Sequence, residues 1–298
     1  MCGLVGLLLK NPDMRAHLGE LMVPMLIGMT ERGPESAGLA VFTNGAAAGE
    51  LKYSLHAPTS DFNWASLESD FNGHPGSKVR VITKGNHAVL ISRLEPHVVK
   101  ARLGEHFPGV HVLSVGQAID VYKDTGSPAA VAERYGFQNL RGTHLVGHTR
   151  MATESAVTPA HAHPFTAGTD FCVAHNGTLS NAFSIRRKLE PFGIDFETDN
   201  DTEAACRFLE WRMREGDDLE TAIDRSFNEL DGFYTFLIGT KDTLALVRDG
   251  FACKPAVVAE TDDYVAIASE FRSLAKLPSI KNAKLFEPAP EEFYVWRV

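Results

Sequence analysis

The start of the chain most constrains its fold and chemistry, because Met1-Cys2-Gly3 leads directly into the apolar run of residues 4–9. This run predicts a buried strand over residues 2–9. Removal of Met1 would leave Cys2 with a free α-amine beside its thiol, a pair that an internal cysteine lacks. The reference pKa of an α-amine is about 8 and that of a thiol about 8.5, so the amine can accept the thiol proton near neutral pH. Cys2 is therefore either an N-terminal nucleophile or a small apolar residue packed at the start of a strand.

The composition indicates a globular chain without a nucleic-acid or membrane surface. The 298 residues are 44% hydrophobic and 22% charged, which suits one large or two modest domains. The formal net charge is −9 and no dense run of Lys and Arg occurs, so nucleic acid is not the expected partner. The first apolar run is too short for a membrane span and lacks the basic leader of a signal peptide. The four cysteines form no CxxC pair, so we expect a reducing cytoplasm rather than disulfides or a thiolate zinc site.

Hydrophobic periodicity predicts a layered α+β fold. Residues 17–31 place apolar side chains at helical spacing on one face, which predicts a core-facing helix. Compact turn signals between neighbouring strands in the second half favour antiparallel pairing. The expected strands of this half lie at residues 144–149, 171–175, 233–239, 243–248, 256–259 and 264–268, and a further strand is expected at 39–42. The expected helices lie at 181–190, 202–215 and 219–230.

Residues 51–115 have a different order of elements: strand, helix, strand, strand, helix, strand. The expected ranges are 51–56, 61–71, 78–83, 87–92, 95–104 and 110–115. This is the split β-α-β order of ferredoxin-like modules. We therefore expect one catalytic domain over residues 1–298 with a subdomain inserted at about 45–140.

Short motifs follow Cys2-Gly3 in a fixed order along the chain. They are the loop 32–38, Gly147-His148-Thr149-Arg150-Met151-Ala152-Thr153, Ala162-His163-Pro164, His175-Asn176-Gly177, Asp199-Asn200-Asp201-Thr202-Glu203, the segment 248–255, and Ala268-Ser269-Glu270. Together they resemble the class II glutamine amidotransferases, whose catalytic domain is an N-terminal-nucleophile hydrolase. The resemblance spans nearly the whole chain outside the insertion. It implies a four-layer αββα sandwich, here with an inserted ferredoxin-like βαββαβ segment.

The resemblance also implies a chemistry. Cys2 would attack the side-chain amide of glutamine, form a γ-glutamyl thioester, release ammonia, and yield glutamate on hydrolysis. The Asn176 side-chain amide and the Gly177 backbone N–H would stabilise the oxyanion. Taken alone, Asn176-Gly177 is first of all a turn signal.

Further residues of these motifs would bind the free amino acid. By resemblance, Arg150 and Thr153 would bind the α-carboxylate, and Asp201 would bind the ammonium group. Arg32 and His163 would support the site without taking part in the chemistry. Taken alone, Arg150 could be an ordinary ion-pair arginine and Asp201 a helix N-cap.

A cluster of histidines raises the alternative of a metal site. Its members are His144, His148, His161, His163 and His175. No His-Glu-x-x-His helix or completing carboxylate set accompanies them, and alternate strand residues share a face by simple geometry. The sequence therefore predicts no metal.

The chain ends soon after Ala268-Ser269-Glu270, which leaves no room for a synthase domain. We therefore expect a dedicated subunit of a hetero-oligomer, most similar to the stand-alone amidotransferase subunit of N-methylglutamate synthase and of glutamate-synthase-like systems. The resemblance implies no cofactor in this chain, and FMN with an iron–sulfur cluster in the partner. Two alternatives stay open: an independent amidohydrolase acting on a γ-glutamyl compound, and a catalytically silent assembly subunit.

Overall fold

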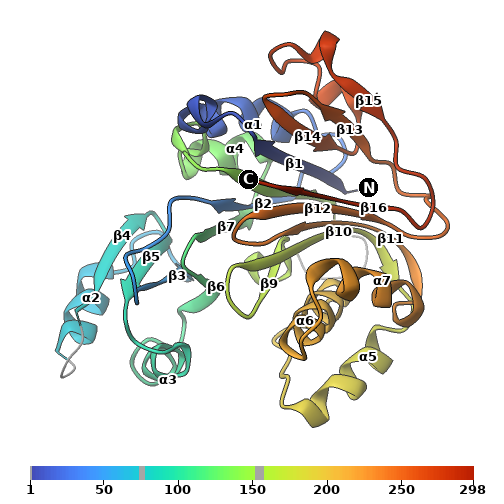
Figure 1. Ribbon diagram of the computed structural model, residues 1–298. Helices are drawn as coiled ribbons and strands as arrows, with labels where there is room; N and C mark the ends of the chain where they lie inside the picture. Colours follow the sequence, from blue (N-terminus) through green and yellow to red (C-terminus); the bar gives the residue numbers. More distant parts are fainter. Residues whose placement is uncertain (1, 74–77, 152–157) are drawn as a thin grey trace.

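The computed structural model describes residues 2–73, 78–151 and 158–298. Within these residues, two antiparallel sheets pack face to face and helices cover both outer faces (Figure 1). The seven-stranded sheet has the order β15-β13-β14-β1-β8-β2-β7, and the five-stranded sheet has the order β16-β12-β11-β10-β9. This arrangement confirms the expected αββα sandwich.

For the strands that the sequence predicted, the observed bounds lie close to the expected ones. The seven-stranded sheet contains β1 (Gly3–Leu9), β2 (Ser36–Phe42), β7 (Ile119–Thr125), β8 (His144–Arg150), β13 (Val257–Glu260), β14 (Tyr264–Ala268) and β15 (Lys284–Phe286). The five-stranded sheet contains β9 (Phe165–Ala167), β10 (Phe171–Leu179), β11 (Gly232–Gly239), β12 (Thr243–Arg248) and β16 (Phe293–Arg297).

Helices form the two outer layers. The seven-stranded sheet is covered by α1 (Leu18–Ile27) and α4 (Pro128–Arg134), and the five-stranded sheet by α5 (Ala182–Leu189), α6 (Asp201–Arg214) and α7 (Leu219–Glu229). Short 3-10 helices occur at η1 (Pro12–His17), η2 (Phe137–Asn139), η3 (Pro159–His161), η4 (Glu190–Phe192), η5 (Phe271–Ser273) and η6 (Ile280–Asn282). None of the helices in the described part of the chain combines the length and apolar character that a membrane span requires.

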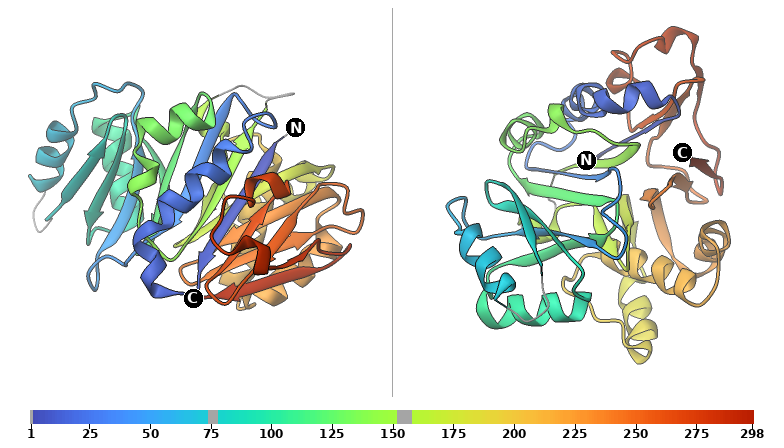
Figure 2. Two further views of the ribbon diagram at one scale, coloured as in Figure 1. Left: turned by 90° about the horizontal axis from the view of Figure 1, so that it is seen from above. Right: turned by 60° about the vertical axis from the view of Figure 1, so that its left-hand side comes forward.

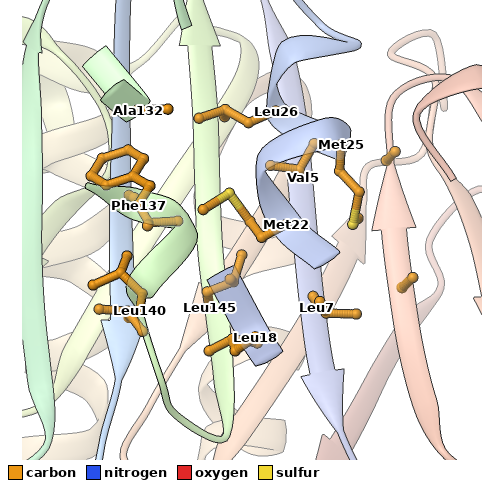
Figure 3. Close-up of a cluster of buried hydrophobic side chains, with 14 of the residues drawn as sticks. Val5, Leu7, Leu18, Met22, Met25, Leu26, Ala132, Phe137, Leu140 and Leu145 are labelled. Carbon is orange, nitrogen blue, oxygen red and sulfur yellow. The ribbon is translucent and has the colours of Figure 1, made fainter. Parts of the chain in front are cut away.

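Strand alternation builds the core. In β1, Val5 and Leu7 pack in the cluster beneath α1, whereas Leu4 and Leu8 pack in the cluster between the two sheets. Figure 3 shows Met22 and Met25 of α1 in one cluster with Val5 and Leu7 of this strand. The methionine-rich face is therefore core, as expected. The helix is shorter than expected because residues 12–17 form the 3-10 turn η1 and Gly28 follows its last turn.

A separate four-stranded sheet lies beside the sandwich (Figure 2). It contains β3 (Leu51–His56), β4 (Arg80–Lys84), β5 (His87–Ser92) and β6 (His111–Gly116), with helices α2 (Trp64–Asn72) and α3 (Pro96–His106). The sheet order is β4-β5-β3-β6, with antiparallel neighbours throughout. This is the ferredoxin-like topology that the element order predicts.

The inserted sheet ends earlier than the expected insertion. Strand β7 pairs with β2 along Ile119–Thr125, and α4 packs against α1. These elements belong to the seven-stranded sheet and its helix layer, and the sequence analysis missed them. The division into a domain over 1–298 and a subdomain at about 45–140 stays a prediction.

Candidate active site

Cys2 lies directly before β1, at the end of the sandwich where β8 and β14 flank that strand. Gly3 pairs with Thr149, and a Cβ at residue 3 would lie 2.8 Å from Met29 Cβ and from Thr149 Oγ1. Only glycine therefore fits beside the cysteine. Half-buried Cys2 opens onto a cleft of about 370 Å³.

The backbone of Cys2 is fixed through its carbonyl oxygen. Arg32 Nε donates to this oxygen at 2.8 Å, and Asn176 Nδ2 donates to it at 3.1 Å. Arg32 also forms an ion pair with Glu270 at 2.9 Å, which holds the guanidinium in place. The Cys2 Sγ lies 3.9 Å from Met151 O, on the cleft side. The expected supporting residue Arg32 thus contacts the candidate nucleophile directly.

Asn176 is oriented by the buried ring of His148. Two acceptors, His175 O and Asn176 Oδ1, each lie 3.1 Å from His148 Nε2, so this nitrogen carries the proton and donates. The amide nitrogen of Asn176 therefore points to Cys2 O and to Ser269 Oγ, each at 3.1 Å. Because both amide protons have protein acceptors, an oxyanion role requires Asn176 to share one of them with the substrate.

Asn176 and Gly177 lie inside β10, paired with Thr235 and Tyr234 of β11. The alternative that this pair forms a turn is therefore wrong. Gly177 has a φ of 148°, and a Cβ there would lie 2.0 Å from Phe233 O. The strand can pass the cleft in this conformation only with glycine.

Two opposite charges line the cleft with Cys2. Arg150 ends β8 and is 7% exposed, and Asp201 begins α6. The N-cap of α6 is Asn200, whose side chain accepts from Thr202 N, so the N-cap alternative for Asp201 is wrong. A guanidinium and a carboxylate in one cleft suit the two charged groups of a free amino acid. Thr153 lies outside the described residues.

The remaining expected residue, His163, forms a wall of the cleft. Its ring stacks on His148 at a centroid distance of 4.2 Å, and its Nδ1 accepts from His175 N at 3.2 Å. Burial lowers the pKa of His148 to about 3 and holds the pKa of His163 well below its usual range. The rings are therefore neutral at pH 7 and position backbone and amide groups. Among the residues that the structure describes, no three His, Cys, Asp or Glu side chains form a metal-binding group.

Sequence reasoning assigned no role to His148 or Ser269. His148 orients Asn176, while Ser269 Oγ accepts from Asn176 and, at 2.9 Å, from Leu4 N. Both residues lie within motifs that the sequence analysis singled out. The motifs therefore contained the signal for these two residues, but the spacing of residues in a sequence does not show which side chains contact each other.

The fold has a counterpart among solved structures. The glutamine phosphoribosylpyrophosphate amidotransferase from B. subtilis superposes with a TM-score of 0.63 and 18% sequence identity, over 99% of this chain and 47% of that chain. At this identity the likeness shows the fold alone. Together with the layer order, it shows that the chain has the fold of the N-terminal-nucleophile hydrolases.

Sequence comparisons define the family. A model of the glutamine amidotransferase domain matches residues 148–276. The glutamine amidotransferase-like protein GlxB of Rhizobium meliloti (strain 1021) is 46% identical over 99% of this chain and 98% of its own length. A putative glutamine amidotransferase of Methanothermobacter thermautotrophicus is 31% identical over 99% of both chains. The chain belongs to the class II glutamine amidotransferases, enzymes that hydrolyse glutamine.

Proposed function

We propose that this chain is the glutaminase subunit of a hetero-oligomeric amidotransferase, with Cys2 as its nucleophile. The observation that carries the proposal is the cleft in which Cys2, Arg150 and Asp201 meet. Arg150 binds the α-carboxylate of glutamine and Asp201 binds its ammonium group, so the side-chain amide extends toward Cys2. Thr153 is proposed as a second partner of the carboxylate.

The proposed reaction requires that Met1 has been removed, so that Cys2 carries a free α-amine. The α-amine accepts the thiol proton, and Cys2 Sγ attacks the amide carbon to form a C–S bond. The C–N bond then breaks as the amine returns the proton to the leaving nitrogen, which departs as ammonia. Water attacks the γ-glutamyl thioester, releases glutamate and restores the thiol. Asn176 and the Gly177 N–H stabilise the oxyanion in both steps.

The proposed acceptor of the ammonia is a separate synthase subunit of the glutamate-synthase type, as in N-methylglutamate synthase. FMN and an iron–sulfur cluster would belong to that partner. The GlxB relative matches this chain over 98% of its own length, whereas the B. subtilis amidotransferase has about half of its length outside the match. Exposed aromatic side chains also support a docked partner: Phe183 lines the Cys2 cleft, and Phe251 and Phe271 closely follow the ends of β12 and β14.

The nucleophile is tested by comparing Cys2→Ala with Cys253→Ala, an exposed cysteine that serves as the matched control. We expect Cys2→Ala to lower the rate of glutamine hydrolysis by at least ~100-fold, the loss typical when a main catalytic contribution is removed. The Cys253 variant should keep full activity. Mass spectrometry should find the wild-type N-terminus at Cys2 and a covalent adduct there after treatment with a diazoketone analogue of glutamine.

Retained turnover in Cys2→Ala would exclude the mechanism. An intact Met1 with no adduct would favour an assembly subunit without activity. Faster hydrolysis of another γ-glutamyl compound, with no gain from any partner, would favour an independent amidohydrolase.

A further inference from the structure

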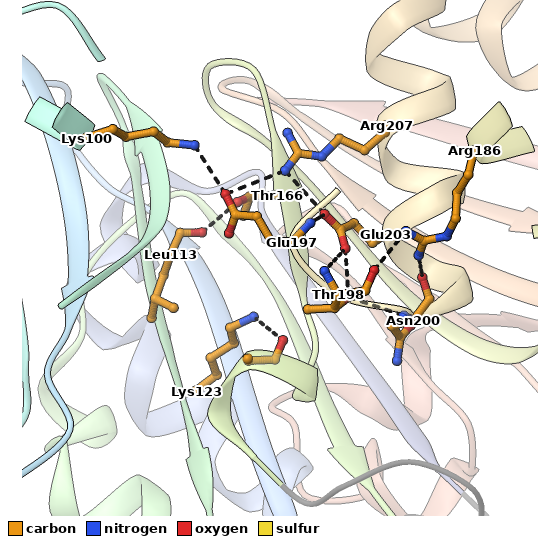
Figure 4. A network of polar contacts seen from close by, with 11 residues as sticks. Lys100, Leu113, Lys123, Thr166, Arg186, Glu197, Thr198, Asn200, Glu203 and Arg207 are labelled. Carbon is orange, nitrogen blue, oxygen red and sulfur yellow. Dashed lines mark hydrogen bonds and ion pairs between the residues drawn. The ribbon is translucent and has the colours of Figure 1, made fainter. Parts of the chain in front are cut away.

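A second cavity, of about 180 Å³, lies where the inserted sheet meets the sandwich. We call it the junction cavity. Its lining comes from α3 and β6 of the insertion, from β7 and β9 of the two main sheets, and from α6 with the loop before it. Figure 4 shows its charged side chains gathered between these elements. Cys2 does not line it.

Lys123 brings an unneutralised charge into the junction cavity. The side chain is 5% exposed, and its Nζ donates to Ala162 O at 3.1 Å and lies 4.8 Å from the centre of the Phe165 ring. Among the described residues, no carboxylate lies within ion-pair distance of this ammonium group. Burial lowers the pKa of Lys123 to about 8, which still leaves most of the group protonated at pH 7.

The other charges of the junction cavity are paired. Lys100 Nζ lies 3.3 Å from Glu197, and Arg207 lies 3.4 Å from Glu203. Glu203 also accepts from Glu197 N and Thr198 N, both at 2.8 Å. The lining thus carries three cations against two carboxylates, and the excess positive charge is that of Lys123.

Ser114 supplies a hydroxyl group without a hydrogen-bond partner. This residue is 2% exposed and is one of those that line the junction cavity, and within the described part of the chain its buried Oγ has no hydrogen-bond partner. A buried hydroxyl without a partner costs on the order of 1–3 kcal/mol. A hydroxyl that can donate and an unneutralised ammonium group in one small cavity match a single carboxylate.

We propose that the junction cavity binds a small monocarboxylic acid, with its carboxylate held by Lys123 and Ser114. The cavity has about half the volume of the Cys2 cleft, 180 Å³ against 370 Å³. It is smaller than the roughly 300–1,000 Å³ of sites for drug-sized ligands, so it suits an acid of a few carbon atoms.

Two connections join the junction cavity to the Cys2 cleft, and this part of the inference rests on the proposed function. Lys123 holds the carbonyl of Ala162, directly before the cleft residue His163. Glu203 holds Glu197 N and Thr198 N, in the loop that leads to Asp201. A bound carboxylate competes with Ala162 O for Lys123 and loosens this wall of the cleft. The acid therefore raises the KM for glutamine several-fold, within the range of typical coupling between sites.

The binding test uses the full chain and saturation-transfer difference NMR, with lactate and propionate as probes. At about 1 mM probe, close to a millimolar Kd, we expect clear saturation transfer to wild-type protein. Lys123→Met and Ser114→Ala should each weaken it several-fold, and the exposed-lysine control Lys241→Met should not. The Ser114 variant keeps the test valid if Lys123→Met fails to fold. Absence of saturation transfer to wild-type protein, or equal signals in all variants, would overturn the proposed site.

The coupling test measures glutamine kinetics with and without lactate. The expected result is a higher KM in wild-type and Lys241→Met protein, and a smaller increase in Ser114→Ala at the same lactate concentration. Binding without any change in KM would overturn the coupling but not the site. Because NMR detects binding without turnover, an inactive chain would contradict the proposed function and leave the result on the junction cavity intact.

Discussion

Asp201 binds the backbone with one carboxylate oxygen and keeps the other for the proposed ligand. Asp201 Oδ2 accepts from Leu179 N at 2.9 Å, whereas its Oδ1 lies 3.8 Å from His175 Nδ1. The carboxylate is therefore oriented by β10 before any ligand arrives. This orientation lowers the entropy cost of binding an ammonium group.

Asp201→Asn should raise the KM for glutamine by roughly 10- to 100-fold, because a hydrogen bond to a charged group contributes about 1.5–3 kcal/mol. The asparagine oxygen can still accept from Leu179 N, so kcat should change much less. Steady-state kinetics with glutamine measure both constants. Asp199→Asn is the control, since Asp199 lines the same cleft but is largely exposed. Equal KM values for the two variants would contradict the role of Asp201.

At the scale of elements, β10 carries both candidate oxyanion donors and the support for Asp201. Its pairing with β11 runs from Cys172 to Leu179 without interruption. A residue with a side chain at position 177 would collide with Phe233 O on the neighbouring strand. The geometry of the cleft therefore depends on the close approach of these two strands.

Gly177→Ala should destabilise the protein by about 2 kcal/mol or more and reduce glutamine hydrolysis, because the added methyl group forces β10 and β11 apart. Urea unfolding measures the first effect. Gly104→Ala in α3 is the matched control: no atom lies within 4 Å of its added Cβ, so we expect a gain of up to ~1 kcal/mol. A destabilisation of equal size in both variants would contradict the packing argument.

The elements that sequence could predict are those with strong local patterns. β12 and β14 have the predicted bounds because compact turns and continuous apolar runs mark their ends. β7 and α4 were missed, since Ile119–Thr125 places Asp120, Lys123 and Asp124 in a mostly buried strand. The two carboxylates are paired only by tertiary contacts, Asp120 with Lys52 at 2.6 Å and Asp124 with Arg134 at 2.6 Å.

The sequence predicted which residues form the candidate site, but not how their side chains contact one another. The motifs gave Cys2, Arg150 and Asp201, which the structure brings into one cleft. They did not show that Asn176 extends a strand, or that His148 orients it. The local turn propensity of Asn176-Gly177 predicted a turn, which is wrong. Eight paired positions between β10 and β11 hold these residues in a strand and outweigh that propensity.

At the scale of the whole molecule, histidines buried in different layers remain neutral together. Burial lowers the pKa of His87 and of His148 to about 3, and that of His144 to about 4. His87 joins the inserted sheet to β7 by accepting from Lys123 N at 3.3 Å. The junction between the two parts of the molecule thus contains a group that resists protonation.

The free energy of unfolding should fall as the pH falls from about 6.5 to 5. The unfolded chain binds protons at these histidines in this range while the folded chain does not, and each contributes up to ~1.4 kcal/mol per pH unit. Urea unfolding across this range measures the slope. His87→Gln should reduce the slope by about one proton, whereas the exposed control His97→Gln should leave it unchanged. An identical slope in the His87 variant would contradict the argument.

The anchoring of Cys2 has a consequence for the order of events during synthesis. Cys2 is synthesised before Asn176, which holds its carbonyl oxygen, and before β14, which pairs with its strand. A nascent chain therefore carries Cys2 without its anchoring contacts until both of these later segments have been made. Products truncated before β14 would carry the Cys2 thiol without the strand pairing that positions it.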